Sequence, residues 1–354
     1  MDEHPDLDPP RGERPDPVAG QARGLTRRTV LKGSAALGAA ALGGSVLGLQ
    51  RQKVLEPRAE IPHVHGAGGG GPVADITPGG FDPTSFATRF HLGRVTRLPD
   101  GRTLREFDVV AIDKEIEIAP GVWFPAWTYN GTVPGPTLRC HEGDRVRVHF
   151  TNAGSHPHTM HFHGFHPADM DGVFEIVEPG KSFVYEFDAA PFGLHLYHCH
   201  TTPLRRHIHK GLYGAFIVDP PGGRSPALEY VMVMNGFDTN FDNENEFYAV
   251  NTVAFHYMRH PLPATVGEPV RLYVVNALEF DLINSIHLHA NFFDVYRTGT
   301  RLEPSDFTDT IMFCQGERHI LELTFRHPGR FMFHAHQSEF AELGWMGFFD
   351  VRPA

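Results

Sequence analysis

The chain has few of the residues on which several common protein classes depend. Its 354 residues include only three cysteines, too few for a disulfide scaffold or a four-thiolate zinc site: Cys140, Cys199 and Cys314. Its nine methionines do not cluster, so a methionine-rich site for cuprous ions is not supported. Lys and Arg total 31 against 42 Asp and Glu, and no basic stripe could bind a phosphate backbone. We therefore expect no nucleic-acid partner.

A long apolar run is also missing, with one partial exception near the N-terminus. Residues 33–50 are uncharged, but ten of these 18 residues are Gly or Ala, so the stretch is much less apolar than a membrane-spanning helix. It follows Arg27 and Arg28, an arrangement typical of a twin-arginine export signal. The sequence thus predicts an export signal and N-terminal tail over 1–60, a linker over 61–85, and a periplasmic or otherwise extracytoplasmic protein. A retained membrane anchor stays open, because no cleavage site is evident.

Beyond the linker, short runs in which apolar and polar residues alternate predict β-strands. Examples are Arg145–Phe150, Phe183–Phe187 and Val270–Val275, and Gly, Pro, Asn and Asp separate such runs. Alternation of this kind indicates strands with one buried face rather than helices. We therefore expect an all-β chain.

An internal repeat divides this all-β region into two copies. The segment His158–His163 matches Asn284–His289, and Pro191–His200 matches Pro328–His336. One ancestral domain was therefore duplicated. The strand spacing predicts two β-sandwich domains, at 86–220 and 221–354, which join at the turn-forming residues 220–223.

Histidine is abundant, with 24 residues, and imidazole is the commonest transition-metal ligand in proteins. Any single His-x-His pair is more often an exposed strand than a metal site. Four pairs, however, recur at matching positions of the two copies: His161 with His163, His198 with His200, His287 with His289, and His334 with His336. Residues i and i+2 of a strand point to the same face, so each pair presents two imidazoles together. Eight imidazoles would serve about three metal ions.

Cys199 lies between His198 and His200, so its side chain should point into its own domain while theirs point out of it. A single thiolate with two further histidines in a β-sandwich is the pattern of a blue, type 1 copper centre. The candidate ligands are Cys199, His158 and His207. Leu212 would occupy the axial position, and because leucine cannot coordinate a metal, we expect a three-coordinate centre.

These motifs resemble the copper motifs of multicopper oxidases. The resemblance rests on residues 158–164, 198–200, His207 with Gly211-Leu212, and the segment 130–136 before Glu142-Gly-Asp144. It covers almost all of residues 110–354. With two repeats rather than three, it points to the two-domain, laccase-like branch, which is related to copper nitrite reductases. It implies two tandem cupredoxin-like Greek-key β-sandwich domains.

The resemblance also implies how copper is distributed. The eight paired histidines would hold one type 2 and two type 3 coppers, with His161 and His287 as type 2 ligands and the other six as type 3 ligands. Phenols, aromatic amines or metal ions would each give one electron to the type 1 copper, and dioxygen would be reduced to water. Because each domain supplies four cluster ligands, the cluster would form at an interface between unlike domains. In two-domain relatives this interface lies between subunits, so the resemblance implies that this chain forms a homotrimer with copper clusters at its interfaces.

The second copy has lost the type 1 ligands but kept its histidine pairs. Asn284, Ala335, Phe340 and Trp345 replace His158, Cys199, His207 and Leu212. Domain 2 therefore cannot build a blue site, and the resemblance implies one type 1 copper, in domain 1 only.

Two of these assignments have a rival residue close by in the sequence. His209 is a rival of His207, because the spacing from Cys199 is longer than in much of the family, and we favour His207 for its spacing to Gly211-Leu212. Asp171 matches the acidic residue that delivers protons to the cluster, ahead of Asp169.

Two other functions stay open, a copper nitrite reductase and an exported copper-binding or tolerance protein without turnover. A nitrite reductase needs three histidines at its catalytic copper rather than eight. The donor is not fixed by the sequence, although Arg205 and Arg206 could favour anionic donors. A disulfide between Cys140 and Cys314 also stays open.

Overall fold

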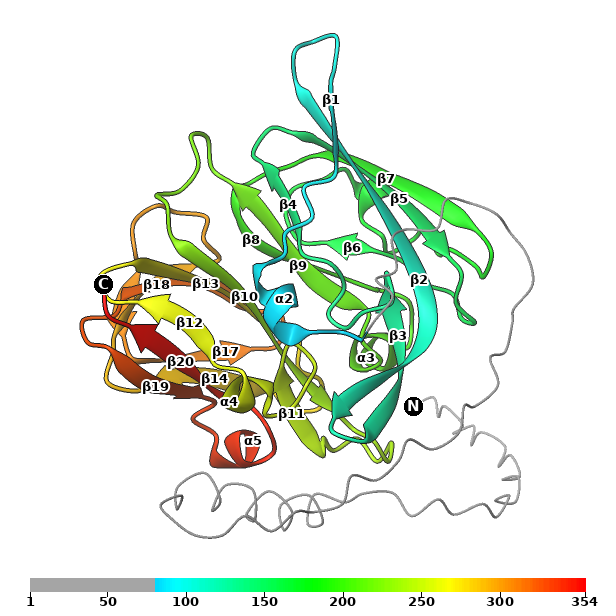
Figure 1. The fold of residues 1–354 in the computed structure, drawn as a ribbon. Coiled ribbons are helices and arrows are strands. Elements are labelled where there is room, and N and C mark those ends of the chain that lie inside the picture. Colours follow the sequence, from blue (N-terminus) through cyan, green and yellow to red (C-terminus); the bar gives the residue numbers. More distant parts are fainter. Residues whose placement is uncertain (1–79) are drawn as a thin grey trace, which may run out of the picture.

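The computed structural model describes residues 80–354, so the predicted export signal and most of the predicted linker lie outside the described residues. The described chain consists mainly of strands, which form four sheets, and the prediction of an all-β chain is confirmed (Figure 1). Within residues 80–354, no helix is long and apolar enough to cross a membrane. The three cysteines are free, with Cys140 buried and Cys314 exposed, so they form no disulfide.

Domain 1 contains two sheets. The first consists of β1 (Arg94–Arg97), β2 (Thr103–Ala119), β3 (Val122–Tyr129), β5 (Arg145–Asn152) and β7 (Ser182–Asp188). The second consists of β4 (Leu138–His141), β6 (His161–Phe162), β8 (Gly193–His198) and β9 (Tyr213–Asp219). Two of the runs predicted as strands are confirmed as parts of β5 and β7. Parallel pairing of β2 with β5 and of β4 with β9 brings together strands that are distant in sequence.

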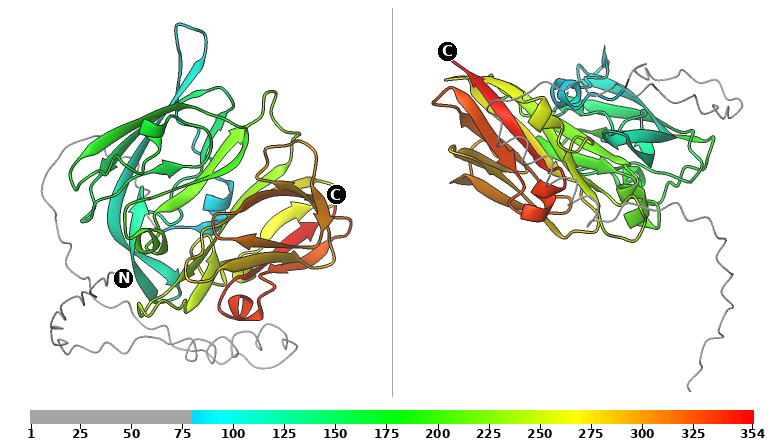
Figure 2. Two further views of the ribbon diagram at one scale, coloured as in Figure 1. Left: turned by 180° about the vertical axis from the view of Figure 1, so that it is seen from behind. Right: turned by 60° about the horizontal axis from the view of Figure 1, so that its bottom comes forward.

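Domain 2 repeats this arrangement beside domain 1 (Figures 1 and 2). Its first sheet consists of β10 (Leu228–Phe237), β11 (Phe247–Val250), β13 (Pro269–Asn276), β15 (Phe293–Arg297), β16 (Asp306–Thr308) and β18 (Arg318–Thr324). Its second consists of β12 (Leu262–Thr265), β14 (Ile283–Leu288), β17 (Thr310–Cys314), β19 (Gly329–His334) and β20 (Met346–Arg352). The third predicted strand is confirmed as part of β13.

The second sheet of domain 1 is covered on both faces, and β8 and β9 are buried along their whole length. Leu194 and Leu196 of β8 belong to an apolar core shared with domain 2, whereas Tyr197 and Cys199 belong to the core of domain 1 alone. Successive residues of a strand point to opposite faces, so β8 links these two cores. Its backbone is also tied to domain 2, because the Leu194 N–H donates to the Thr298 carbonyl at 2.7 Å.

Short helices fill the connections between strands. Helices α3 (Leu204–His209) and α5 (Ser338–Glu342) follow the second histidine pair of each copy, and a 3-10 helix, η1 (Ala168–Met170), follows the first pair of domain 1. Helix α2 (Pro83–Thr88) spans the predicted start of domain 1 but packs against domain 2. There the Tyr257 hydroxyl of α4 (His256–Arg259) donates to the Pro83 carbonyl at 2.8 Å.

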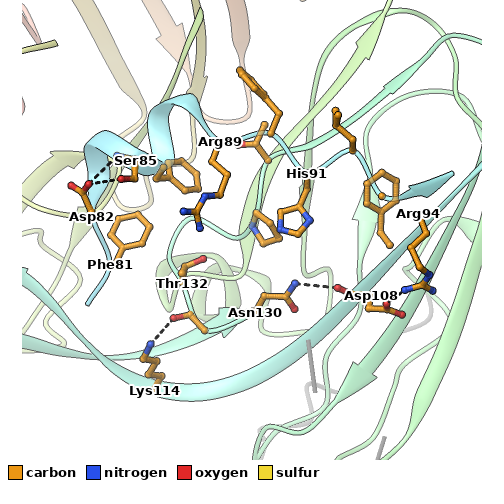
Figure 3. Close-up of a pocket in the computed structure, with 18 of the residues that line it drawn as sticks. Phe81, Asp82, Ser85, Arg89, His91, Arg94, Asp108, Lys114, Asn130 and Thr132 are labelled. Atoms are coloured by element: carbon orange, nitrogen blue, oxygen red, sulfur yellow. Dashed lines mark hydrogen bonds and ion pairs between the residues drawn. The ribbon is translucent and has the colours of Figure 1, made fainter. Parts of the chain in front are cut away.

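The segment from α2 to β1 then crosses to domain 1 and encloses a cavity of about 860 Å³ (Figure 3). Arg89, His91 and Lys114 line this cavity, and none of the predicted copper ligands does. The Lys114 ammonium donates to the Gly131 carbonyl at 3.0 Å, and Asn130 donates to the Asp108 carbonyl at 3.1 Å. The cavity is therefore separate from the histidine pairs.

A buried ion-pair network joins the two domains where β4, β9 and β10 meet. Arg139 of β4 donates to both carboxylate oxygens of Asp219, at 2.7 and 3.0 Å, and to Glu229 of β10 at 2.6 Å. Arg271 of β13 donates to the same Glu229 at 2.9 Å. The Arg139 guanidinium also lies 4.7 Å from the centre of the Phe90 ring. Removing Arg139 would leave the buried Asp219 without a counterion and Glu229 with Arg271 alone, which is costly.

We predict that Arg139→Met destabilises the protein by roughly 3 kcal/mol, because Asp219 and Glu229 lose their shared partner. The control is Arg102→Met, which removes an arginine paired with Asp100 and Asp188 at the surface and should cost less than ~1 kcal/mol. Denaturant unfolding at one fixed protein concentration measures both. Equal losses for the two variants would show that the network does not hold the domains together.

Candidate metal centres

Three predicted ligands converge inside domain 1. His158 precedes β6, Cys199 follows β8, and His207 lies in α3, and all three side chains are buried. The Nδ1 atom of His207 lies 3.2 Å from the Cys199 Sγ and 3.2 Å from the Nδ1 of His158, which itself lies 4.0 Å from the Sγ. We call this group the thiol site. Two nitrogens and one sulfur face a common point, which is the donor set that copper prefers in blue centres.

The backbone around the thiol site fixes this convergence. The Cys199 N–H donates to the Leu212 carbonyl at 3.0 Å, and the Leu212 N–H donates to the His207 carbonyl at 3.2 Å. Leu212 is itself fully buried. Gly211 has a φ of +113°, and a Cβ there would lie 2.4 Å from the Val133 side chain. Only glycine therefore fits at the turn that brings His207 back toward Cys199.

Burial keeps the two imidazoles of the thiol site neutral. Desolvation, with contributions from His207 and His156, lowers the pKa of His158 to about 3. Desolvation, with contributions from His156 and Arg206, lowers the pKa of His207 to about 4. Desolvation also raises the pKa of the Cys199 thiol, although hydrogen bonds with Thr201 and Thr159 oppose this. Neutral imidazoles can donate lone pairs to a metal, so the site fits a copper ion that would displace the thiol proton.

His209, the rival of His207, points elsewhere. Its Nε2 accepts a hydrogen bond from the Asp238 N–H at 3.1 Å, and its ring lies between Phe124 and Phe280. Two positions within one turn of α3 therefore point in different directions, His207 to the thiol site and His209 to the boundary with domain 2.

The first two histidine pairs form one cluster on the outer face of the same sheet. His161 of β6 lies directly opposite His198 of β8 in the antiparallel register, and the backbone of His163 pairs with that of Leu196. The Nε2 atoms of His163 and His198 lie 3.3 Å apart, and the His161 and His200 ring centres lie 5.4 Å apart. We call these four residues, His161, His163, His198 and His200, the first half-site.

Hydrogen bonds orient the rings of the first half-site. The Nδ1 of His161 donates to the Asp171 carbonyl at 2.8 Å, and the Nδ1 of His198 donates to the Cys199 carbonyl at 2.9 Å. With the proton on Nδ1, the lone pair is on Nε2, which faces the other rings. Desolvation, with a contribution from Arg318, lowers the pKa of His163 to about 2. The cluster thus offers neutral imidazole lone pairs.

Asp171 reaches His161 with its side chain as well. Its carboxylate lies 3.2 Å from the His161 Nδ1 and 3.6 Å from the Nε2 of His166. Asp169, the other acid considered from the sequence, shows no such contact among the interactions of the described residues. His166 is a residue that the sequence motifs do not single out, because it has no counterpart in the repeat.

The second two pairs form a matching cluster in domain 2. His287 of β14 lies opposite His334 of β19, and the Nε2 atoms of His289 and His334 lie 3.0 Å apart. The His287 and His336 ring centres lie 5.5 Å apart. We call these four residues, His287, His289, His334 and His336, the second half-site.

The second half-site is oriented in the same way as the first. His287 donates through Nδ1 to the Asp309 carbonyl at 3.0 Å, and His334 donates through Nδ1 to the Ala335 carbonyl at 2.6 Å. The His336 N–H donates to the Ser285 hydroxyl, as the His200 N–H does to the Thr159 hydroxyl. The duplication has therefore preserved the ligands together with the groups that hold them. Asp309 is a second residue that the sequence motifs miss.

Apolar side chains fill the position in domain 2 that corresponds to the thiol site. The Phe340 ring stacks on Tyr248 with centres 4.0 Å apart, and Trp345 packs edge-on against Phe333. The backbone is unchanged, because Ala335 N–H donates to the Trp345 carbonyl as Cys199 N–H does to Leu212. The prediction that domain 2 holds no thiol ligand agrees with this packing.

The two half-sites do not meet within one chain. Among residues 80–354, no hydrogen bond, ring contact or ligand cluster joins a histidine of one half-site to a histidine of the other. His289 and His336 are exposed, whereas His198 is buried. Each half-site therefore presents its imidazoles without any contact from the histidines of the other half-site in the same chain.

Comparison with known proteins places the chain in a family. Two family models, both described as multicopper oxidase, match residues 112–223 and 225–354. A solved structure titled as a multicopper oxidase is 60% identical, has a TM-score of 0.76, and covers 77% of this chain and 98% of its own. A copper nitrite reductase structure from Nitrosomonas europaea is 28% identical, with a TM-score of 0.65, over 70% of this chain and 94% of its own.

Curated relatives show the same mixture of activities. The copper-containing nitrite reductase of Neisseria meningitidis is 31% identical over 241 residues, and copper resistance protein A of Escherichia coli is 35% identical over 119 residues, 32% of this chain and 19% of its own length. This chain spans 62% of the length of that nitrite reductase, and 62% of this chain is matched. Because the family models cover both halves of the described chain, this chain belongs to the multicopper oxidase family, whose members bind copper.

Proposed function

We propose that this protein is a laccase-like oxidase that couples the one-electron oxidation of small donors to the reduction of dioxygen to water. The observation that carries the proposal is the presence of eight histidines in two matching half-sites, together with a single thiol site. The thiol site would hold one type 1 copper, and the eight imidazoles would hold one type 2 and two type 3 coppers. Copper at these positions would supply one-electron chemistry, so that four donor electrons and four protons convert one dioxygen into two waters.

The chain links the thiol site to the first half-site through three consecutive residues. Cys199 faces the core of domain 1, and its neighbours His198 and His200 face the half-site. The Cys199 carbonyl also accepts the hydrogen bond from the His198 Nδ1 at 2.9 Å. This covalent and hydrogen-bonded connection would be the route by which electrons pass between the two positions.

Asp171 is proposed to hold protons beside the first half-site. Its carbonyl fixes the tautomer of His161, and its carboxylate faces both His161 and His166. Reduction of dioxygen consumes protons, so an acid at this place can supply them through its Oδ1 atom. His166, whose Nε2 donates to the Phe162 carbonyl at 2.8 Å, would keep the carboxylate in position.

A homotrimer, in which the first half-site of one chain meets the second half-site of another, would complete both. Each domain exposes large apolar side chains in the stretch of chain around or after its first histidine pair, and such an assembly would cover them. Those of domain 1 are Phe165, Phe174 and Ile176, and those of domain 2 are Leu282, Ile283, Phe292, Phe307 and Met312. We call these two groups the apolar rims.

Nitrite reduction is the second candidate, and the relatives of that name favour it. A nitrite reductase would use three histidines at its catalytic copper and would leave most of the paired histidines without a metal. The number of coppers per chain therefore separates the two functions.

We predict about four coppers per chain in the fully loaded protein and the consumption of one dioxygen for every four molecules of a phenolic donor oxidised. Metal analysis and an oxygen electrode measure these ratios. About two coppers per chain, with nitrite turnover and no oxygen uptake, would establish the nitrite reductase instead.

We predict that His207→Ala abolishes the blue absorption and removes about one copper per chain, because one of the three donors of the thiol site is lost. His209→Ala, two residues away in the same helix, should keep both the colour and the copper. Visible absorption and metal analysis of the two purified variants provide the measurement. Loss of colour in His209→Ala alone would reverse the assignment.

We predict that Phe174→Glu dissociates the trimer and lowers oxidase activity per chain by more than about tenfold, because burying an unpaired carboxylate costs several kcal/mol. Phe174 is 79% exposed in the isolated chain and belongs to the apolar rim of domain 1. Val95→Glu, at a 58% exposed position of β1 outside both rims, is the control. Light scattering gives the mass of each variant. A fully active Phe174→Glu monomer would contradict interfacial clusters.

A further inference from the structure

A second cavity, of about 400 Å³, lies beside the thiol site in domain 1. We call it the Trp127 pocket. It is lined by the paired middle parts of β2 and β3, the loop before β6, and helix α3 with the residue that follows it. The lining includes Asp113, Glu115, Trp127, His156, Arg206 and Lys210. A volume of this size accommodates a small aromatic molecule.

A single ring, the indole of Trp127, lies between the pocket and the thiol site. Its indole centre lies 4.8 Å from the His207 ring and 5.2 Å from the His158 ring, while its other neighbour, His156, lies at 4.5 Å and lines the pocket. The Trp127 N–H donates to the Lys210 carbonyl at 2.8 Å, which ties β3 to the end of α3. A molecule in the pocket is therefore close to both imidazoles of the thiol site.

Lys210 contributes an ammonium to this pocket. The residue as a whole is 7% exposed, and its Nζ lies 5.0 Å from the Phe124 ring, 5.9 Å from Trp127 and 5.1 Å from Phe241. Within residues 80–354, this ammonium has no hydrogen bond and no ion pair. Aromatic faces compensate a partly desolvated cation only in part, so the site favours an additional anionic partner.

Arg206 adds a second cation at the same ring. Its guanidinium lies 5.2 Å from the centre of the Trp127 ring, and the described part of the chain gives it no carboxylate within ion-pair distance. The two acids of the lining do not neutralise these cations by direct contact. The Asp113 carboxylate accepts the hydrogen bond of the Ser155 hydroxyl, and Glu115 is exposed to solvent.

Arg205, the neighbour of Arg206, faces away. Its guanidinium lies 5.4 Å from the Phe280 ring of domain 2, and it does not line the pocket. The two adjacent arginines therefore differ in their surroundings, although the sequence alone proposes the same role for both. This difference provides a matched control within one turn of α3.

We propose that the Trp127 pocket binds an aromatic donor through an anionic substituent, a sulfonate or carboxylate, held by Lys210 and Arg206. This inference rests on the proposed oxidase function for the identity of the ligand as a donor. It assigns to Lys210 and Arg206 the role of binding residues and to Trp127 that of the ring against which the donor packs. Anionic donors are then bound more tightly than neutral donors of the same shape.

The test is equilibrium binding to the full, copper-loaded protein by calorimetry. The probe is naphthalene-2-sulfonate, which lacks the hydroxyl or amino group that an oxidase would attack, and its neutral counterpart is naphthalene-2-methanol. We expect the sulfonate to bind at least about tenfold more tightly than the alcohol, equivalent to ~1.4 kcal/mol. Lys210→Met, which keeps the apolar stem, and Arg206→Gln should each remove most of this preference, and Arg205→Gln should keep it.

Several outcomes would overturn the proposal. One is equal affinity for the sulfonate and the alcohol. The other is a preference for the sulfonate that persists in both Lys210→Met and Arg206→Gln. If Lys210→Met does not fold, the comparison of Arg206→Gln with Arg205→Gln still tests the proposal, because Arg206 is exposed. Oxygen uptake with a neutral phenol, measured on the same samples, reports separately on the proposed oxidase function. Sulfonate binding without oxygen uptake would preserve the pocket and remove the function.

Discussion

The structure depends on one property of an extended strand, namely that successive side chains point to opposite faces. In β8 and the two residues after it, this alternation places Cys199 in the core of domain 1 and His198 and His200 on the other face. One strand therefore contributes to both the thiol site and the first half-site, provided that both of its faces are structured. The packing of domain 2 against Leu194 and Leu196 meets that condition, because it covers the outer face of the same sheet. The interdomain contact thus serves the site as well as the stability of the fold.

Much of the fold and most of the ligand set could be predicted from the sequence, because both follow from short-range periodicity and from the repeat. The strands β5 and β7 were evident from alternation, β13 was predicted as a strand although it is buried on both faces, and the histidine pairs were evident from their recurrence. Strands buried on both faces carry no such alternation, and β9 is an example. The pairing of domains across β8 and the crossing of α2 to domain 2 depend on long-range contacts, which local patterns do not encode.

The residues that support the ligands were the least predictable. His166 and Asp309 act through contacts with Asp171 and His287, and neither lies in a motif. The choice between His207 and His209 rested on spacing. In the structure only His207 faces Cys199, because two positions in one turn of a six-residue helix point in different directions. In the same helix, Arg205 and Arg206 are equivalent in sequence, yet only Arg206 reaches the Trp127 pocket. A short helix next to the site converts small differences in position into different chemical surroundings.

The second domain shows what remains when a metal position is lost. Phe340, Tyr248 and Trp345 fill the volume with rings, so this part of domain 2 needs no metal for its packing. The backbone hydrogen bonds of the former site persist, and they are the same bonds that hold the strand carrying His334 and His336. Apolar packing therefore keeps the second half-site in position without a neighbouring thiol. A duplicated domain can in this way lose the side chains of the thiol site and still keep the four histidines of its half-site, so the two copies differ in one set of candidate ligands and agree in the other.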